Sequence, residues 1–191
     1  MIDYKQLKTL KNGFLLLSQI LDFPEAEILS PSFLTEAENL FPEIPEKADF
    51  LSNLTALQEQ NLQSLQENYT SLFELNKRVT LYCTYYKLKD SREQGNVMAK
   101  LKMLYEMFGV ELEQSELTDY LPTMLEFLGV GEFDAEDERI DDLNLLFSII
   151  EDGTYEILQH AQEFDDEPYI KLVKIVRNTV KHCMIQERIT A

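Results

Sequence analysis

The residues that could bind a metal or act as nucleophiles are few and widely spaced. The chain has two cysteines, Cys83 and Cys183, and two histidines, His160 and His182. Zinc sites usually draw their ligands from closely spaced pairs, and no Cys-x-x-Cys pair occurs here. A site made of His182, Cys183 and Cys83 can be imagined, but two buried cysteines and an incidental histidine account for the pattern more simply. We therefore expect no metal, no disulfide and no thiol nucleophile.

Motifs for other chemistries are also missing from the sequence. It contains no glycine-rich phosphate loop, no GxSxG elbow, no HExxH pair and no dinucleotide fingerprint. The acidic run DAEDERIDD, residues 134–142, lacks the central glycine and the regular oxygen spacing of a calcium loop. Carboxylates are abundant, but acid–base catalysis needs a desolvated pair with separated pKa values, which spacing alone does not reveal. We expect neither an enzyme nor a bound cofactor.

Aromatic residues are the remaining candidates for function, and they suit binding better than catalysis. Tyrosine combines an apolar ring with a polar tip, and such residues are common where a protein receives an amphipathic peptide. The competing interpretation is that most of these rings belong to the core. Six aromatic residues fall in the middle of the chain: Tyr69, Phe73, Tyr82, Tyr85, Tyr86 and Tyr105.

The formal net charge of −18 is the strongest compositional signal. Residues 106–168 hold twenty acidic residues and one basic residue, Arg139, whereas residues 77–102 hold seven basic and two acidic ones. Nucleic acid and anionic lipid both require neutralising cations, so we expect neither as a partner. A cationic partner would be attracted, although the acidic residues could equally form an ordinary solvated surface.

Helices must position these residues, because apolar side chains recur at helical spacing along almost the whole chain. The run FLLLSQIL is too short to span a bilayer, so we expect a cytoplasmic protein that does not insert into membranes. The expected fold is all-α, a single helical bundle of roughly nine to ten helices over residues 1–191, with a mobile acidic loop near 129–142. The patterns predict helices at 4–21, 32–41, 50–65, 92–108, 119–129, 140–153, 154–161 and 166–184.

Two segments need separate treatment. In residues 77–90 the side chains of Val79, Leu81, Cys83 and Tyr85 alternate as in a strand, but no partner strand occurs elsewhere, so we predict a helix. In the other segment, ELTDYLPTMLEFLG, Asp119 is the expected N-cap, Pro122 falls in the first turn and Gly129 is expected to end the helix. Its Glu126 is expected to project with Pro122 and Thr123 from a polar face.

Three stretches together resemble a known family. YTSLFELNKRVTLYCTYY, DSREQGNVMAKLKMLYEMFG and ELTDYLPTMLEFL are similar, in order and spacing, to the central part of the NarJ branch of the TorD/DmsD/NarJ redox-enzyme maturation chaperones. Members of this branch are also called nitrate reductase delta subunits. The close match covers about residues 60–129. Each motif is weak alone, whereas the ordered set is specific.

The resemblance implies an all-helical chaperone without catalytic turnover or a cofactor of its own. It implies binding of the N-terminal segment of the apo catalytic (alpha) subunit of respiratory nitrate reductase. That subunit would be held in the cytoplasm for molybdenum cofactor insertion before it docks at the membrane during anaerobic nitrate respiration. The client segment is expected to be basic and amphipathic, which fits an acidic receptor with exposed rings. Cofactor-delivery proteins are further candidate partners, and we expect a monomer or a weak homodimer.

The aromatic cluster and the family's motifs together nominate the peptide-binding residues. We hypothesise that the helix at 119–129 holds Tyr120 and Glu126 at the edge of a groove whose floor is the helix after Ser91. Arg92 is expected to pair with Asp119 or Glu126 and to keep the two segments in register. The candidates are Tyr69, Phe73, Tyr82, Tyr85, Tyr86, Asp90, Arg92, Tyr105, Asp119, Tyr120, Pro122, Glu126 and Phe127.

Two alternatives stay open at this stage. The chain could be a structural helical adaptor or a permanent accessory subunit of a membrane redox complex, docking through the acidic loop at 129–139. An enzyme acting on a small anion ranks third, because only the basic stretch 77–102 could attract such a substrate.

Overall fold

The computed structural model describes residues 2–89, 91–112, 117–133 and 142–184. Within these ranges the regular structure is helical, which confirms the expected all-α fold. The α-helices are α1 (Tyr4–Leu21), α2 (Pro31–Leu40), α3 (Lys47–Gln58), α4 (Leu62–Tyr69), α5 (Tyr85–Leu88), α6 (Arg92–Met107), α7 (Leu121–Val130), α8 (Leu143–His160) and α9 (Pro168–His182). Short 3₁₀ turns lie at Ala26–Leu29 and Gln162–Phe164, and a π-helical turn at Thr70–Glu74 follows α4. The acidic run 134–141, the main part of the loop expected to be mobile, lies outside the described residues.

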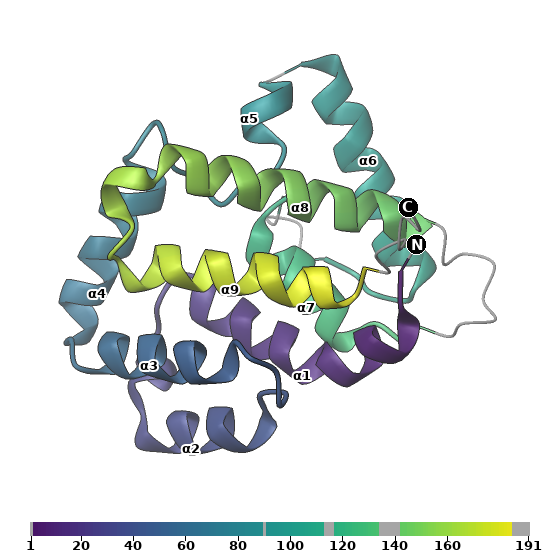
Figure 1. Cartoon of the computed structure of the whole chain (residues 1–191). Coiled ribbons are helices and arrows are strands. Elements are labelled where there is room, and N and C mark those ends of the chain that lie inside the picture. Colours follow the sequence, from purple (N-terminus) through teal and green to yellow (C-terminus); the bar gives the residue numbers. More distant parts are fainter. Residues whose placement is uncertain (1, 90, 113–116, 134–141, 185–191) are drawn as a thin grey trace, which may run out of the picture.

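The helices pack in layers around α1 and α9. Figure 1 shows α8 and α9 side by side in opposite directions, with α1 and α3 against α9 and α2 below α3. The helices α5 and α6 project from the far side of α8. Near the two chain ends Ile2 pairs with Met184, and the Asp3 N–H donates to the Cys183 carbonyl at 2.7 Å. Of the helices in the described ranges, none is long and apolar enough to cross a bilayer.

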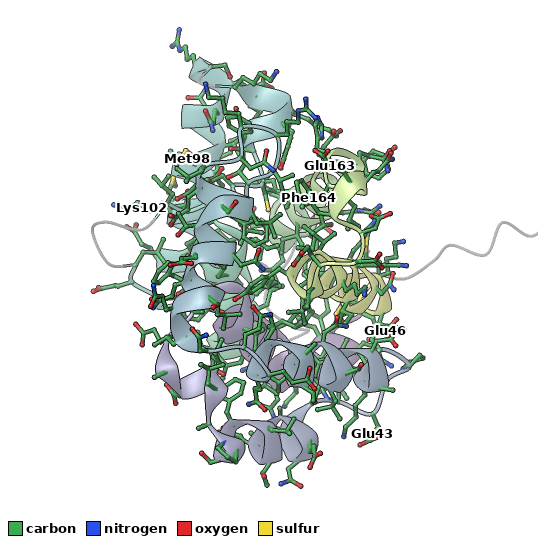
Figure 2. The ribbon with its side chains drawn as sticks, turned by 90° about the vertical axis from the view of Figure 1, so that its left-hand side faces the viewer. Glu43, Glu46, Met98, Lys102, Glu163 and Phe164 are labelled. Atoms are coloured by element: carbon green, nitrogen blue, oxygen red, sulfur yellow. The ribbon has the colours of Figure 1, made fainter. Side chains whose placement is uncertain are left out.

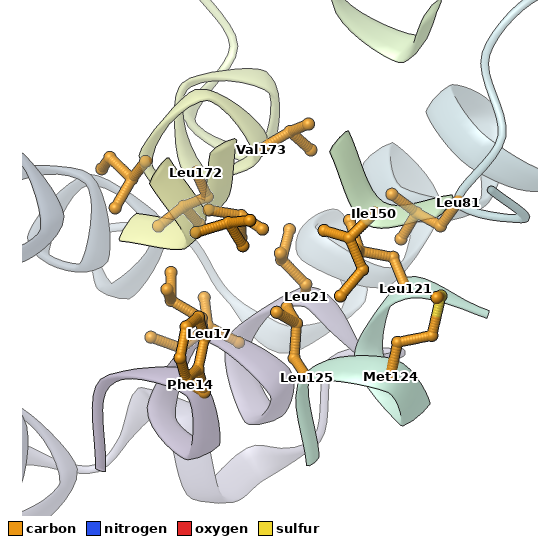
Figure 3. Packing of buried hydrophobic residues seen from close by; sticks show 14 of the residues in the cluster. Phe14, Leu17, Leu21, Leu81, Leu121, Met124, Leu125, Ile150, Leu172 and Val173 are labelled. Carbon is orange, nitrogen blue, oxygen red and sulfur yellow. The ribbon is translucent and has the colours of Figure 1, made fainter. Parts of the chain in front are cut away.

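The packing of α7 on α1 forms the centre of the core. Figure 3 shows Leu17 and Leu21 of α1 facing Leu125 of α7, and all three side chains are fully buried. Gly129 permits this approach, because a Cβ there would lie 3.0 Å from the Leu15 Cβ and 3.1 Å from the Leu15 nitrogen. Helices pack this closely only where one surface lacks a side chain. The expectation that Gly129 ends the helix is therefore wrong: Gly129 is a packing residue within α7, which runs on to Val130.

The sequence correctly predicted several helix starts. Asp3 accepts from the backbone N–H groups of Lys5 and Gln6 and so caps α1, and Ser91 caps α6 by accepting from Gln94 at 3.1 Å. Such side chains satisfy N–H groups that have no partner within the helix. Elsewhere the expected start was shifted slightly: the N-cap of α2 is Ser30, with Pro31 as the first helical residue.

Two predicted helix boundaries are wrong. The single helix expected at 50–65 is divided into α3 and α4, because Asn61 caps α4 by accepting from the Ser64 N–H. Conversely, the helices expected at 140–153 and 154–161 form one continuous α8. Thr154 does not cap a helix; its hydroxyl donates backwards to the Ile150 carbonyl at 2.7 Å.

Gly153 stands inside α8 because Cys83 packs directly on it. A Cβ at position 153 would lie 2.5 Å from the Cys83 Cβ and 2.7 Å from the Cys83 Sγ. Both are far below ordinary contact distance, and the Cys83 side chain is 4 % exposed. The helical conformation does not require glycine here, so the requirement is one of space.

The segment 79–84 is not the helix that we predicted. Residues 79–82 lie outside any helix and form an antiparallel bridge between Tyr82 and Tyr120, and residues 83–84 form a turn that leads into α5. The Cys83 N–H donates to the Asp119 carbonyl, and the Leu121 N–H donates to the Leu81 carbonyl, each at 2.9 Å. The alternation of Val79, Leu81 and Cys83 was therefore a true strand-like signal, and all three side chains are buried. The partner was missed because it is the turn that leads into α7 and not a strand.

We predict that Gly153→Ala lowers the free energy of unfolding by about 1–3 kcal/mol, because the added methyl group displaces Cys83 from a filled core. Equilibrium urea denaturation measures this change. Gly95→Ala is the matched control, because Gly95 lies in α6 and a Cβ added there would have nothing within 4 Å. That variant should gain up to about 1 kcal/mol. Equal unfolding midpoints for the two variants would contradict the packing role of Gly153.

Candidate functional site

Two tyrosine hydroxyls and a carboxylate lie in a row where α1 ends. The hydroxyl of Tyr69 lies 2.9 Å from the Leu21 carbonyl oxygen and 2.6 Å from the hydroxyl of Tyr120. The Tyr120 hydroxyl in turn lies 3.1 Å from Oδ1 of Asp22. Burial raises the pKa of both phenols, so both are protonated at neutral pH. Tyr69 is 2 % exposed, whereas Asp22 is exposed, so the row runs from the core to the surface.

Exposed rings flank this row. The Tyr82 ring lies 5.3 Å from the Tyr120 ring and is 39 % exposed. Phe23 is 42 % exposed and meets the edge of Tyr69 at 5.7 Å. Exposed apolar side chains that gather in one patch, unlike those scattered singly, often mark an interaction site. We call Asp22, Phe23, Glu74, Tyr82 and Tyr120 the aromatic–acidic surface.

Carboxylates surround the Tyr82 phenol. Partial burial raises its pKa first, and the negative charges of Asp119, Glu74 and Asp22 raise it further, in that order. Of these carboxylates, Asp22 and Glu74 are exposed. The surface therefore combines apolar rings with negative charge within one small area.

A buried carboxylate holds the Tyr82 segment against Tyr120. Asp119 is 1 % exposed, and its Oδ2 accepts from the Thr84 hydroxyl at 2.5 Å and from the Thr84 N–H at 3.3 Å. The Thr84 hydroxyl also accepts from Nε2 of Gln94 at 3.0 Å, which ties α6 to the same point. Asp119 is therefore a tertiary clamp between two segments. The N-cap position of α7 is occupied by Tyr120, which makes no side-chain capping bond.

Gln94 provides the link that we expected from Arg92. Arg92 is exposed at the start of α6, and in the described ranges no ion pair joins it to Asp119 or Glu126. The expected pairing is therefore wrong. The expected coupling of α6 to the 119 region exists, through the neutral amide of Gln94, which lies two residues after Arg92 and is half-buried.

The π-helical turn Thr70–Glu74 orients the next part of the surface. The Leu75 N–H donates to the Thr70 carbonyl at 2.9 Å, one residue further back than in an α-helix. Such turns carry one extra residue and are frequent at functional sites. Here the turn buries Leu72 and Phe73 and leaves Glu74 and Leu75 exposed, Leu75 at 75 %.

The structure separates the candidate peptide-binding residues into two groups. Those in the core are Tyr69, Phe73, Tyr105, Asp119, Pro122 and Phe127. Those that reach the surface are Tyr82, Tyr85, Arg92 and Glu126, with Tyr86 and Tyr120 half-buried. Asp90 lies outside the described residues. The structure thus brings Tyr82 and Tyr120 together at the surface, with Tyr69 directly beneath them.

Several core members support the site from below. The Tyr105 hydroxyl donates to the Thr118 carbonyl at 2.7 Å and so fixes the loop before Asp119 to α6.

Tyr86 lies apart from the aromatic–acidic surface, with its ring against His160 at 4.9 Å and its hydroxyl on Thr80. Within residues 121–128 only Glu126 is exposed, so the polar face expected for Pro122 and Thr123 does not exist.

Sequence reasoning missed Asp22, Phe23 and Glu74. Glu74 belongs to the FELN stretch and could have been found there, whereas Asp22 and Phe23 looked like an ordinary helix end before Pro24. Nothing in their types or spacing shows that α1 ends beside Tyr120. That neighbourhood exists only in the folded protein.

The chemistry available in the described ranges is that of binding. No group of three or more His, Cys, Asp or Glu side chains there could hold a metal. Burial raises the pKa of the Cys183 thiol to about 12 and that of Cys83 also upward, so both thiols are protonated at neutral pH. Figure 2 shows Lys102 of α6 on the opposite side of the molecule from Glu43, Glu46 and Glu163. Lys102 is therefore set apart from these three acidic residues.

The family model and the curated relatives that match this chain describe the same kind of protein. A family model described as nitrate reductase delta subunit matches residues 35–164. Over 73 residues the chain is 38 % identical to the probable nitrate reductase molybdenum cofactor assembly chaperone NarJ of Bacillus subtilis, covering 38 % of this chain and 40 % of that protein. Over 119 residues it is 28 % identical to the nitrate reductase molybdenum cofactor assembly chaperone NarJ of Escherichia coli K12, covering 59 % of this chain and 49 % of that protein. The chain thus spans about half, or less, of the length of the curated relatives that it matches.

A solved structure shares the fold. The crystal structure of a candidate redox enzyme maturation protein from Archaeoglobus fulgidus superposes with a TM-score of 0.60 at 22 % sequence identity. The superposition covers 90 % of this chain and 93 % of that chain. At this identity the likeness shows that the two chains have the same helical architecture.

We predict that Thr84→Val lowers the free energy of unfolding by about 1–3 kcal/mol, because Asp119 then keeps its buried charge but loses a hydroxyl donor. Valine has nearly the same shape as threonine, so little packing is lost. Thr55→Val is the matched control: Thr55 is exposed, and its hydroxyl bonds only to the Leu51 carbonyl of its own helix. That change should stay within about 0.5 kcal/mol. Urea denaturation of both variants tests the clamp, and equal losses would rule it out.

Proposed function

Because this chain belongs to the nitrate reductase delta subunit family, we propose that it is an assembly chaperone for respiratory nitrate reductase. It binds the N-terminal segment of the apo catalytic subunit and holds that subunit in the cytoplasm. Molybdenum cofactor insertion then precedes docking at the membrane. The chaperone itself carries no cofactor and makes or breaks no covalent bond.

The observation that carries this proposal is the aromatic–acidic surface. An exposed segment of an unfinished enzyme presents apolar side chains, which Phe23 and Tyr82 can cover. A basic segment is also attracted at long range by a protein of net charge −18. Rings supply contact area and carboxylates supply steering, so an amphipathic cationic peptide fits both properties.

The same surface suits a partner that must leave again. Its rings are only partly open, and its carboxylates are exposed to solvent. Attraction between exposed charges is modest and is screened by salt, which favours reversible binding. A holding role requires such reversibility, because the client must later be released to its membrane partner.

A second role, that of a permanent accessory subunit, is favoured by one observation only, the description of the family as a subunit. The two roles differ in stoichiometry. A chaperone accompanies the apo catalytic subunit and is absent from the mature complex, whereas a permanent subunit is present there in equal amount.

We predict that the protein co-purifies with the catalytic subunit from cells unable to make molybdenum cofactor, and that deletion of the client's N-terminal segment abolishes this. The reason is that the segment provides the contact area. Quantitative pull-down with mass spectrometry measures the ratio of this protein to the catalytic subunit, once with the intact client and once with the truncated client. An equimolar amount of this protein in the mature, cofactor-loaded membrane complex would contradict the chaperone role and support the accessory subunit.

We also predict that the affinity for a synthetic N-terminal peptide of the catalytic subunit falls about tenfold between 0.05 and 0.5 M salt, because screening shortens the attraction between the opposite charges. Isothermal titration calorimetry at the two salt concentrations measures the change. A peptide with its basic residues replaced by glutamine is the control, and its weaker affinity should not depend on salt. The steering role would be refuted by equal affinities of the native peptide at both concentrations.

A further inference from the structure

One glycine of α6 is not explained by contacts within the chain. Gly95 lies inside the helix, its φ is not positive, and a Cβ added there would have nothing in the described part of the chain within 4 Å. Glycine is a poor residue for a helix interior, because it loses more conformational freedom on folding than any other residue. Neither a turn nor a close neighbour requires it here. A surface that approaches α6 from outside would use the missing side chain.

Gly95 belongs to an exposed row along α6. Residues four apart lie on the same face of a helix, so Gly95, Ala99 and Met103 form one ridge. All three residues are exposed, Met103 at 61 %, and Figure 1 shows α6 projecting from the body of the molecule. Methionine has a flexible, polarizable side chain and is common on adaptable binding surfaces. The row therefore places a protruding apolar side chain two helical turns from a gap.

Opposite charges lie at equal distances from the middle of this row. Arg92 stands seven residues before Ala99, and Glu106 stands seven residues after it. At 100° per residue, these two residues and the row fall within a stripe of about 80°. In the described ranges no ion pair engages Arg92, and Glu106 lies 4.0 Å from Lys102, at the limit of an ion pair. Both charges thus remain available to groups outside the chain.

Reversal of the row about Ala99 exchanges each feature with its complement. The gap at Gly95 changes places with the Met103 side chain, and the positive Arg92 changes places with the negative Glu106. Two antiparallel copies of α6 related by a two-fold axis at Ala99 therefore match in shape and in charge, as an interface between identical subunits must. A second copy of the chain supplies both complements at once, whereas an unrelated partner would not require this symmetry.

Net charge and size make such a contact weak. Two chains of charge −18 repel each other, and the repulsion is smallest where basic residues offset the acidic ones, as in residues 77–102. A single pair of 16-residue helices makes a small interface, whereas stable interfaces bury about 1,200–2,000 Å². We therefore expect association only at high protein concentration.

We propose that the exposed face of α6 is the contact through which this chain forms a weak homodimer with two-fold symmetry. The Met103 side chain of each copy fills the gap at Gly95 of the other, and Ala99 meets Ala99 on the axis. Arg92 of each copy pairs with Glu106 of the other, one pair at each end of the contact. This inference is independent of the proposed function, because it involves no client.

Sedimentation equilibrium of the full chain at increasing protein concentration tests the gap. Gly95→Gln fills it with a better helix former, so we expect the protein to stay folded and its association constant to fall about tenfold or more. Ala48→Gln introduces the same side chain at an exposed position of α3 and is the matched control, with a change of less than about twofold. A native chain that stays monomeric up to its solubility limit, or equal association of the two variants, would overturn the proposal.

A charge exchange tests the paired ends of the contact. Arg92→Glu and Glu106→Arg should each weaken association severalfold, because each leaves like charges opposed at both ends. The double variant should restore it, because the pairs form again with their signs exchanged. Glu106→Arg also lowers the net negative charge, so an effect of overall repulsion alone would strengthen association in this variant. Strengthening there, or no recovery in the double variant, would rule out the assigned pairs and with them the two-fold contact.

A cross-link locates the axis. Only a residue on the axis lies next to its own copy, so Ala99→Cys should form an intermolecular disulfide under mild oxidation, which requires Cα atoms within about 7 Å. The native Cys83 and Cys183 are buried and do not compete. Ala48→Cys is the control and should remain largely monomeric on non-reducing electrophoresis. Cross-linking that is no greater at position 99 than at position 48 would show that α6 is not the contact.

Discussion

The buried carboxylate of Asp119 is the interaction on which the rest of the site depends. It binds the hydroxyl and N–H of Thr84, and through that hydroxyl the amide of Gln94. Three separate parts of the chain therefore meet at one charge: the segment 79–84, the loop before α7 and the start of α6. A charge removed from water is costly unless its acceptor positions are filled, so these donors cannot leave singly without a large penalty. The position of the Tyr82 ring over Tyr120 follows from this clamp.

The packing of α7 in the core explains the particular residues found in this short helix. It packs on α1 through Gly129 and is buried on nearly every side, with Glu126 and Val130 exposed to solvent. Its role is to hold α1 and the 119 region in one rigid unit. That unit places Asp22, at the end of α1, within reach of Tyr120. The burial of α7 does not test the expectation that this helix forms one edge of a groove. The helix does support the aromatic–acidic surface from beneath.

Sequence patterns were most reliable where one helix face is apolar and the other is polar. The stripes of α1, α6 and α9 were predicted nearly to the residue, because the period of 3.6 is a direct record of one-sided burial. Glycine misled us at positions 129 and 153, because both glycines serve close packing, and a terminating glycine looks the same in sequence. The segment 79–84 was predicted wrongly for a different reason. Its partner is a single isolated bridge at Tyr120, which is too short to leave an alternating pattern of its own. For the site, the sequence indicated that tyrosines and acidic residues would take part. Only the fold shows which aromatic rings are exposed to solvent and that α1 ends beside them.

The π-helical turn Thr70–Glu74 makes this part of the molecule sensitive to chain length. An α-helix advances by about 100° per residue, so the single extra residue accommodated in the turn sets the direction of everything after it. Removal of one residue between Tyr69 and Leu75 would let α4 continue with regular bonds and would change the direction of Glu74 and Leu75 by about a quarter of a turn. A length difference of one residue between related chains would therefore be enough to change which side chains face this surface.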